Sequence, residues 1–363
     1  MKEKELWFDL RKVNNSDKEN LLNIVFEHGY TGILVDSIED IEKWSTRIKV
    51  FVQANEKKDV IEYYKKMSNK YQVIWVQDNY KGNAIFHKVI DEHTMNEAVA
   101  LVEKAKVMFV EFKDPTNIPL ELILAKGQKE KCQICKVVDT ALDGWNSSMT
   151  MEVGCDALLL RTNNIEHIML MQQYIEKQKE KQLNIVPLKI IEIKHLAMGV
   201  RACIDTTDRL DADEGMLIGS KSSGYVLISS ENHYLPYMNL RPFRVNAGAI
   251  HSYILCPNNI AKYISELKAG DEVLVVNSKG RTRVVNVGRV KLEKRPMLLI
   301  SAQGPQKKEV NVVVQDDWHI RILSCNGEVK NSTLLQKGDV VLGYELEAGR
   351  HLGVKVQETI MEK

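Results

Sequence analysis

The chain has almost no excess of charge of either sign. Its 50 lysines and arginines are balanced by 49 aspartates and glutamates, which gives a formal net charge of +1 over 363 residues. Nucleic-acid-binding proteins usually carry a basic excess, so we expect no nucleic-acid partner. A local cationic pocket for a small anion is compatible with this balance.

Long apolar runs are also missing. No stretch reaches the about 18 consecutive apolar residues that a transmembrane helix needs, so we expect no membrane association. The first five residues, MKEKE, do not resemble a signal peptide, and we expect a cytoplasmic protein. Six cysteines are too few for a disulfide scaffold. The CxxC pair Cys132–Cys135 has no second pair to complete a zinc site, and we interpret it as structural.

Residues 1–187 alternate short apolar runs with amphipathic segments. Apolar runs occupy residues 32–35, 107–110 and 157–160, among others, and helical spacing of apolar residues covers 17–26 and 165–177. This alternation predicts parallel βα units. About seven or eight such units are compatible with a closed barrel or with an open, doubly wound sheet. No GxGxxG follows any of these runs, so the usual dinucleotide fingerprint is missing.

From residue 188 to residue 363 the helical periodicity fades, and glycines and β-branched residues punctuate short apolar runs. Residues 267–274 and 335–342 share the pattern L-x-x-G-D-x-V-L. The Gly-Asp pair suits a tight turn that leads into a strand, because Gly tolerates positive φ and Asp can bond back to the backbone. We therefore predict an α/β domain over 1–187, followed by a mostly β domain over 188–363 with a duplicated hairpin.

The densest polar cluster of the second half lies within residues 229–253. It contains Arg241, Arg244 and Asn246, and converging arginines commonly bind phosphate or carboxylate in a bidentate manner. In a regular strand the two arginines would point to opposite faces, so their convergence requires a turn or a bulge. Gly248 would let the backbone pass close to a neighbour. We predict a site for an anionic small-molecule substrate; interdomain salt bridges are the alternative.

A second cluster covers residues 315–321. Asp316, Asp317 and His319 crowd this short segment, and Asp317 and His319 share a face if the segment is a strand. Carboxylate oxygens with one imidazole suit Mg²⁺, Mn²⁺ or Fe²⁺. A solvated turn anchored by a tryptophan is the alternative.

Two lysines, Lys88 and Lys136, interrupt apolar runs of the first half. A lysine in apolar surroundings can have a lowered pKa and act as a base or as a Schiff-base nucleophile. A buried lysine paired with an acid, such as Asp91 or Asp139, is the alternative. Near the C-terminus, Arg350 and His351 add another cation and another imidazole.

Several segments of the second half occur in a recognisable order. They are residues 201–206 (RACIDT), 214–220 (EGMLIGS), 241–248 (RPFRVNAG), 263–267 (YISEL), 288–291 (GRVK), 295–296 (RP), 350–351 (RH) and 358–363 (ETIMEK). In this order they resemble the 3-dehydroquinate synthase II family. The first half resembles the family chiefly in its pattern of βα units.

The resemblance implies one of two related reactions. Archaeal members are expected to use NAD for the oxidative deamination and cyclisation of an amino-ketoheptonic acid to 3-dehydroquinate. A bacterial branch makes 3-amino-4-hydroxybenzoate from a phosphorylated amino-oxo-heptanoate, without net oxidation, and uses a divalent metal such as Mn²⁺.

Departures from the archaeal pattern favour the bacterial branch. The archaeal pattern reads roughly QNAETIR where this chain has QDDWHIR at 315–321, which raises the number of metal-ligating groups. We therefore expect a lyase that uses Mn²⁺ or another divalent metal, with the NAD-dependent synthase as the alternative and a non-enzymatic anion-binding protein as the third. A homo-oligomer is compatible with the sequence.

We assign site residues on this basis. The predicted metal ligands are Glu231, His251, Asp317 and His319. The predicted substrate contacts are Arg241, Arg244, Asn246 and Arg350. The predicted catalytic residues are His351, Lys136 and Lys88.

Overall fold

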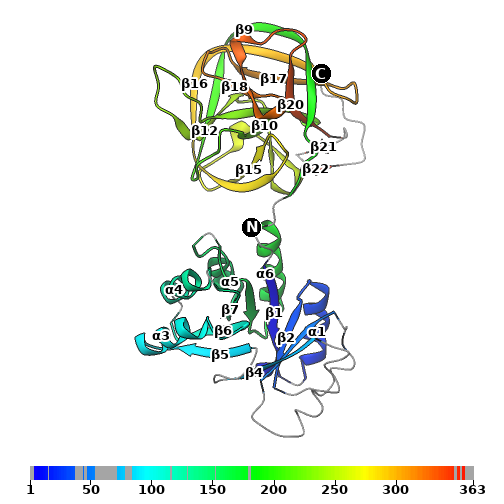
Figure 1. Cartoon of the computed structure of the whole chain (residues 1–363). Helices are drawn as coiled ribbons and strands as arrows, with labels where there is room; N and C mark the ends of the chain where they lie inside the picture. The colour runs from blue at the N-terminus through cyan, green and yellow to red at the C-terminus, as the bar shows by residue number, and fades with distance from the viewer. Residues whose placement is uncertain are drawn as a thin grey trace. The chain divides into compact units, whose positions relative to one another are not determined.

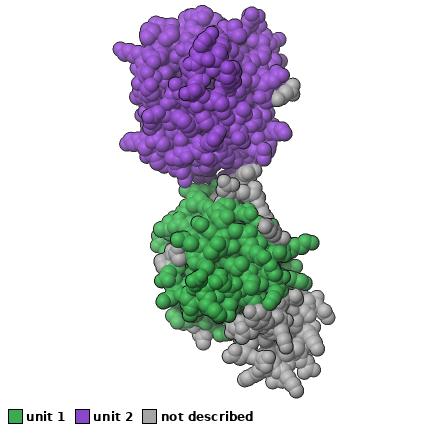
Figure 2. Space-filling model, turned by 60° about the vertical axis from the view of Figure 1, so that its left-hand side comes forward, with its two compact units in different colours: residues 1–179 green, residues 180–363 purple. Residues whose placement is uncertain are grey.

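A computed structural model describes residues 4–14, 16–36, 44, 47–53, 72–77, 84–114, 117–128, 130–151, 153–178, 181–346, 350–351 and 354–355. The chain divides into two compact units, residues 1–179 and 180–363, which are coloured separately in Figure 2. This division falls shortly before the predicted boundary at 187/188, which lies inside the first long strand of unit 2, β9 (Val186–Thr206).

Unit 1 is a closed barrel of eight parallel strands (Figure 1). Its strands are β1 (Glu5–Asp9), β2 (Gly32–Val35), β3 (Lys49–Val52), β4 (Gln72–Gln77), β5 (Ala84–Val89), β6 (Val107–Phe112), β7 (Gln133–Val138) and β8 (Ala157–Leu160). Strand β1 pairs with β2 on one side and with β8 on the other, which closes the ring. Of the two predicted arrangements, the barrel is therefore confirmed.

Amphipathic helices pack against the outside of this ring. They are α1 (Lys18–Glu27), α3 (Glu92–Leu101), α4 (Ile118–Gly127), α5 (Ala141–Ser148) and α6 (Ile165–Gln178), with a 3-10 turn η1 (Leu10–Lys12). Leu21 and Val25, four residues apart on α1, are buried in the same apolar cluster as Phe8 and Ile33 of the strands. None of the described helices is long and apolar enough to cross a membrane.

Aromatic side chains fill the inside of the barrel. The ring centroid of Trp7 lies 4.4 Å from that of Phe51 and 5.5 Å from that of Phe109. Cys135 points into this interior, whereas Cys132 packs with the apolar residues outside the ring. Burial raises the pKa of Cys132 to about 12, so it is a thiol at neutral pH. The two cysteines thus belong to different apolar clusters, which supports the structural interpretation of the CxxC pair.

Gly32, at the start of β2, lies directly against the Trp7 ring. A Cβ atom at this position would lie 2.6 Å from Trp7 Cδ1, and the ring is enclosed by other aromatic rings. We expect Gly32→Ala to lower the free energy of unfolding by about 1–3 kcal/mol, measured by urea denaturation. Adding Trp7→Phe should remove part of this cost, because the two sites are in contact. Strictly additive effects would contradict this account.

Unit 2 is a mostly antiparallel sheet built on two long strands, β9 and β16 (Thr282–Gln303), which pair along most of their length. The other main strands are β10 (Glu214–Lys221), β11 (Gly224–Glu231), β12 (Arg241–Ala249), β13 (Tyr253–Cys256), β14 (Ile260–Tyr263), β15 (Glu272–Asn277), β17 (Glu309–Gln315), β18 (Arg321–Leu323), β19 (Val329–Asn331) and β20 (Val340–Glu345). Strand β9 also pairs with β12 and β20. The predicted mostly β second half is confirmed.

The two L-x-x-G-D-x-V-L segments form the same turn. Each Gly has positive φ, +91° at Gly270 and +98° at Gly338. In both, the Asp carboxylate accepts a hydrogen bond from the backbone N–H three residues earlier. Each turn follows a 3-10 turn, η4 (Ile264–Glu266) or η6 (Ser332–Leu334), and leads into a strand, β15 or β20. The predicted duplication is therefore confirmed in its turn geometry.

Candidate active site

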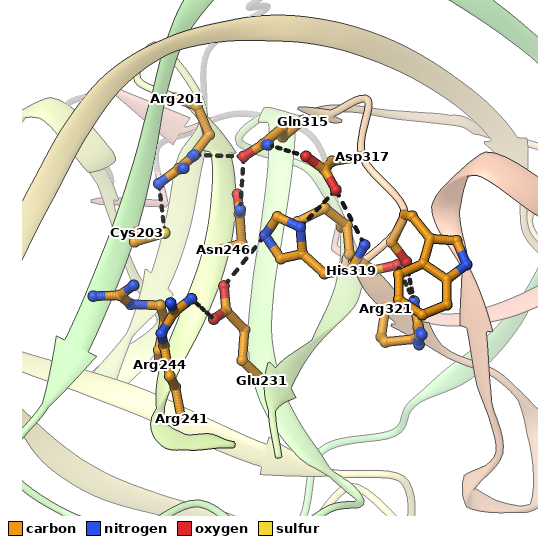
Figure 3. Close-up of polar contacts among 12 residues, drawn as sticks. Arg201, Cys203, Glu231, Arg241, Arg244, Asn246, Gln315, Asp317, His319 and Arg321 are labelled. Atoms are coloured by element: carbon orange, nitrogen blue, oxygen red, sulfur yellow. Dashed lines mark hydrogen bonds and ion pairs between the residues drawn. The ribbon is translucent and has the colours of Figure 1, made fainter. Parts of the chain in front are cut away.

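A chain of polar side chains joins strands β9, β11 and β17 of unit 2 (Figure 3). Arg201 Nε donates to Gln315 Oε1 at 2.7 Å, and Gln315 Nε2 donates to Asp317 Oδ2 at 2.9 Å. Asp317 Oδ1 lies 2.6 Å from His319 Nδ1, and His319 Nε2 lies 3.7 Å from Glu231 Oε1. The sheet thus brings together residues from three distant parts of the sequence.

The His319 ring has a carboxylate at each of its nitrogens. Burial is the largest influence on Asp317 and acts to raise its pKa, but the bonds from His319 and Gln315 outweigh it and hold that pKa below its usual value. On the other side, the Glu231 side chain is only 7% exposed, and its Oε2 accepts from Arg241 Nη1 at 3.1 Å. Its Oε1 is buried without a hydrogen-bond partner among the described residues. This orphaned acceptor requires a donor or a cation.

Three of the four predicted metal ligands come together, and His251 does not. His251 is exposed and lies just after the last residue of β12. Glu231 pairs with Arg241, the first residue of that strand. Asp317 and Glu231 face opposite nitrogens of His319, so they do not converge on one point. Accordingly, the described residues contain no group of three or more His, Cys, Asp or Glu side chains that could hold a metal ion. Two donors, Glu231 Oε1 and His319 Nε2, face each other, and Asp317 orients the imidazole as carboxylates often orient metal-binding histidines.

The two predicted anion-binding arginines are each paired with an acid of the protein. The pairing register between β11 and β12 shifts near Arg241. Such an irregularity was predicted as the condition for the two arginines to converge. Arg244 is nevertheless buried against Asp205, with bonds of 2.6 and 2.9 Å, and Arg241 pairs with Glu231. Gly248 approaches β17, since a Cβ atom at this position would lie 2.1 Å from the Val313 carbonyl oxygen.

Asp205 is the centre of an ion-pair cluster that spans three strands. It lies on β9, directly opposite Arg244 of β12 and opposite Arg289 of β16, whose Nε donates to Oδ2 at 2.6 Å. Burial, the largest influence, acts to raise the pKa of Asp205, but the two guanidinium groups outweigh it and lower that pKa. This cluster connects the three strands beside the candidate site.

The predicted substrate contact Asn246 belongs to the same polar chain. Its Nδ2 donates to Gln315 Oε1 at 3.0 Å, and its Oδ1 is buried without a hydrogen-bond partner among the described residues. The orientations of the Gln315 and Asn246 amides follow from the two charged residues that Gln315 contacts. The Arg201 guanidinium can only donate hydrogen bonds, and the Asp317 carboxylate can only accept them. Gln315 must therefore present its oxygen to Arg201 and Asn246, which leaves Asn246 Oδ1 as a second unpaired acceptor.

The predicted catalytic lysines lie in unit 1. Lys136 is buried on the outer face of β7 and donates to Asn117 Oδ1, Asp143 Oδ1 and Ser147 Oγ at 2.8–3.0 Å. Lys136 is thus a buried lysine paired with an acid, as in the alternative, but the acid is Asp143, whereas Asp139 pairs with Arg161. Lys88 is 57% exposed, 3.8 Å from a glutamate of β6. The side chains of the last two predicted residues, Arg350 and His351 in β21 (Arg350–His351), lie outside the described part of the structure.

Comparison with known proteins assigns both units to one family. The model of the 3-dehydroquinate synthase II N-terminal domain matches residues 3–175, and that of the C-terminal domain matches residues 187–363. The chain belongs to the 3-dehydroquinate synthase II family. The predicted family is therefore confirmed. The match extends to the first half, where the sequence offered few family-specific segments.

Relatives in this family have two different names. The 3-amino-4-hydroxybenzoic acid synthase of Streptomyces griseus is 40% identical over 278 residues, 77% of this chain and 70% of that protein. A 3-dehydroquinate synthase homolog of Aquifex aeolicus is 41% identical over 282 residues, 78% of this chain and 83% of that protein. The 3-dehydroquinate synthase of Methanococcus maripaludis strain C7 is 34% identical over 347 residues, 95% of this chain and 91% of that protein. The names indicate that this family member is an enzyme of aromatic biosynthesis.

Sequence reasoning missed the roles of Arg201, Asp205 and Gln315 in this family member's polar network. Arg201 and Asp205 lie within the family segment RACIDT, where two charged residues flank an apolar stretch of β9. A charge inside an apolar strand was the signal that drew attention to Lys136, and it applied equally here. Gln315 ends β17 and carried no such signal, since its partners come from other strands.

Proposed function

We propose that this protein is a 3-amino-4-hydroxybenzoate synthase-like lyase. It would cyclise and aromatise a phosphorylated amino-oxo-heptanoate, 2-amino-4,5-dihydroxy-6-oxo-7-phosphonooxyheptanoate, with Mn²⁺ or another divalent metal. The observation that carries the proposal is the pair formed by Glu231 and His319. A buried carboxylate oxygen that lacks a hydrogen-bond partner within the described ranges faces an oriented imidazole. The 40% identity to the Streptomyces griseus synthase supports this branch of the family.

In this proposal the divalent ion has two protein ligands, because the described residues bring no third His, Cys, Asp or Glu side chain to this point. Glu231 Oε1 and His319 Nε2 would hold it, and water or substrate oxygens would complete its coordination, as is usual for hard cations. A bound ion would supply Lewis-acid polarisation of the substrate ketone and stabilise the negative charge that develops as the neighbouring carbon loses a proton. Asp317 keeps the imidazole in the required orientation, and Gln315 in turn holds Asp317.

Removal of the proton beside the ketone requires a general base. Of the three predicted catalytic residues, Lys136 is buried and paired with Asp143, and Lys88 lies 3.8 Å from a glutamate. We therefore retain His351 as the proposed base, since an imidazole can take up a proton near neutral pH.

The direct test is one incubation of the purified chain with the phosphorylated substrate and Mn²⁺, without NAD. We expect an aromatic aminohydroxybenzoate and released phosphate, detected by ultraviolet absorbance and mass spectrometry. Chelation of the metal should abolish turnover, and added Mn²⁺ should restore it. Full activity in a chelated, metal-free sample would exclude the metal-dependent mechanism.

A second candidate is an NAD-dependent 3-dehydroquinate synthase II. It is supported by relatives with the name 3-dehydroquinate synthase, including the Methanococcus maripaludis protein that covers 95% of this chain. Its substrate would be the unphosphorylated 2-amino-3,7-dideoxy-threo-hept-6-ulosonate. Growth of NADH absorbance with this substrate, together with ammonia release, would replace the first proposal with this one.

A further inference from the structure

Arg321, at the start of β18, is half-buried and has no carboxylate partner among the described residues. It differs in this from the other arginines of unit 2 that are shielded from solvent. Those form the pairs Arg201–Glu293, Arg241–Glu231, Arg244–Asp205, Arg283–Glu214 and Arg295–Glu293. The positive charge of Arg321 is therefore uncompensated within the described part of the chain, which is costly for a partly desolvated ion.

The contacts of Arg321 leave one edge of its guanidinium group available. Nη1 donates to the backbone carbonyl oxygens of Trp318 and Ile320. Nε and Nη2 have no hydrogen-bond partner among the described residues. These two nitrogens form the planar, two-donor edge that matches the oxygens of a phosphate or a carboxylate. This edge of Arg321 is suited to the bidentate binding of an anion that was predicted for Arg241 and Arg244.

The surroundings of Arg321 hold this edge in place beside the candidate site. Its guanidinium carbon lies 5.5 Å from the centroid of the Trp318 ring, and Trp318 is 45% exposed, so solutes can approach from this side. Figure 3 shows Arg321 beside His319, at the end of the polar chain away from Arg201. Burial lowers the pKa of Arg321, as expected where no acid offsets the desolvation, although a guanidinium remains charged at neutral pH.

We propose that Arg321 anchors an oxyanion of the substrate, a phosphate or a carboxylate, through Nε and Nη2. Trp318 fixes the guanidinium plane by stacking, and the bound oxyanion supplies the missing negative charge. This inference deepens the proposed function and rests on it only for the identity of the molecule that carries the oxyanion.

The test measures anion binding to the full chain by isothermal titration calorimetry. Inorganic phosphate and malonate serve as probes for the two oxyanion types, and the tighter of the two identifies the group that Arg321 takes. We expect Arg321→Gln to weaken binding about tenfold or more, since it removes charged hydrogen bonds. Arg321→Lys should be intermediate, because it keeps the charge and loses the two-donor edge. Arg209→Gln, at an exposed arginine of the same unit, should leave binding unchanged.

Several results would overturn the inference. One is a wild-type chain that binds neither probe. Another is a folded Arg321→Gln variant that binds as tightly as wild type. If circular dichroism shows that Arg321→Gln does not fold, Arg321→Lys decides, and affinity within twofold of wild type would exclude the bidentate grip.

The substrate assay separates this inference from the proposed function. Suppose that the wild-type chain makes no aromatic product but Arg321→Gln loses probe binding. This result would support the anion-binding role of Arg321 and exclude the proposed lyase activity. If Arg321→Gln forms the aromatic product with an unchanged KM, the lyase activity is supported and the anion-binding role of Arg321 is excluded.

Discussion

Glu231→Gln should reduce kcat for aromatic product formation by about a hundredfold to ten-thousandfold, the range that a positioned acid, base or charge usually contributes. The substitution preserves the shape of the side chain. It removes the negative charge from a buried oxygen that has no hydrogen-bond partner in the part of the chain that the structure describes. This oxygen faces His319 Nε2 at 3.7 Å. The affinity for Mn²⁺, measured by calorimetry in the absence of substrate, should fall as well.

The matched control is Glu309→Gln, at an exposed position of β17 in the same unit. It removes the same charge at a distance from the polar chain, and we expect kcat to stay within about twofold of wild type. A Glu231→Gln protein with a wild-type circular dichroism spectrum and nearly full activity would contradict the assignment of this carboxylate to the active site.

Asp205→Asn should be among the most destabilising substitutions in unit 2. It leaves Arg244 buried without its counter-ion and also breaks the bond to Arg289, so we expect a loss of about 3–5 kcal/mol of unfolding free energy. Amide hydrogen exchange of peptides from β9 and β12 reports this unit separately from the barrel. Asp208→Asn removes an exposed ion pair with Arg283 and should cost about 0–1 kcal/mol. Equal effects of the two substitutions would contradict the role of the Asp205 cluster.

The contribution of Asp205 should also depend on pH. Its pKa is lower in the folded chain than in the unfolded chain, so its stabilisation is complete above the unfolded pKa. It is lost as the pH falls through the folded pKa. The difference between wild type and Asp205→Asn should therefore shrink progressively once the pH is lowered below about 4. A difference that stayed constant through this acidic range would argue against the lowered pKa.

The sequence predicted local features of the fold well. Apolar runs alternating with amphipathic segments predicted the βα units, and the Gly-Asp pairs at 270–271 and 338–339 predicted turns with positive φ. Closure of the barrel could not be predicted in the same way. It depends on the pairing of β1 with β8, two strands at opposite ends of unit 1, and hydrophobic periodicity carries no information on such a pairing.

The candidate site was predicted less well, because its contacts depend on strand register. Asp205 neutralises Arg244 only because β9 and β12 place the two residues opposite each other. His251 lies close in sequence to Arg241, but an extended strand separates the two ends of that segment. Glu231, Asp317 and His319 did come together, as expected for residues singled out by their chemistry.

The pairing of early with late strands has a consequence for synthesis of the chain. Unit 1 can close once β8 has left the ribosome, and it can fold while the rest of the chain is still being translated. In unit 2, β9 pairs with β20, where Val341 lies opposite Leu188, so this edge of β9 stays unpaired until nearly the whole chain has been made. Such distant pairings slow folding and leave strand edges open to aggregation. Recovery of active protein should therefore be limited by unit 2, and slower translation of its last strands would prolong the vulnerable state.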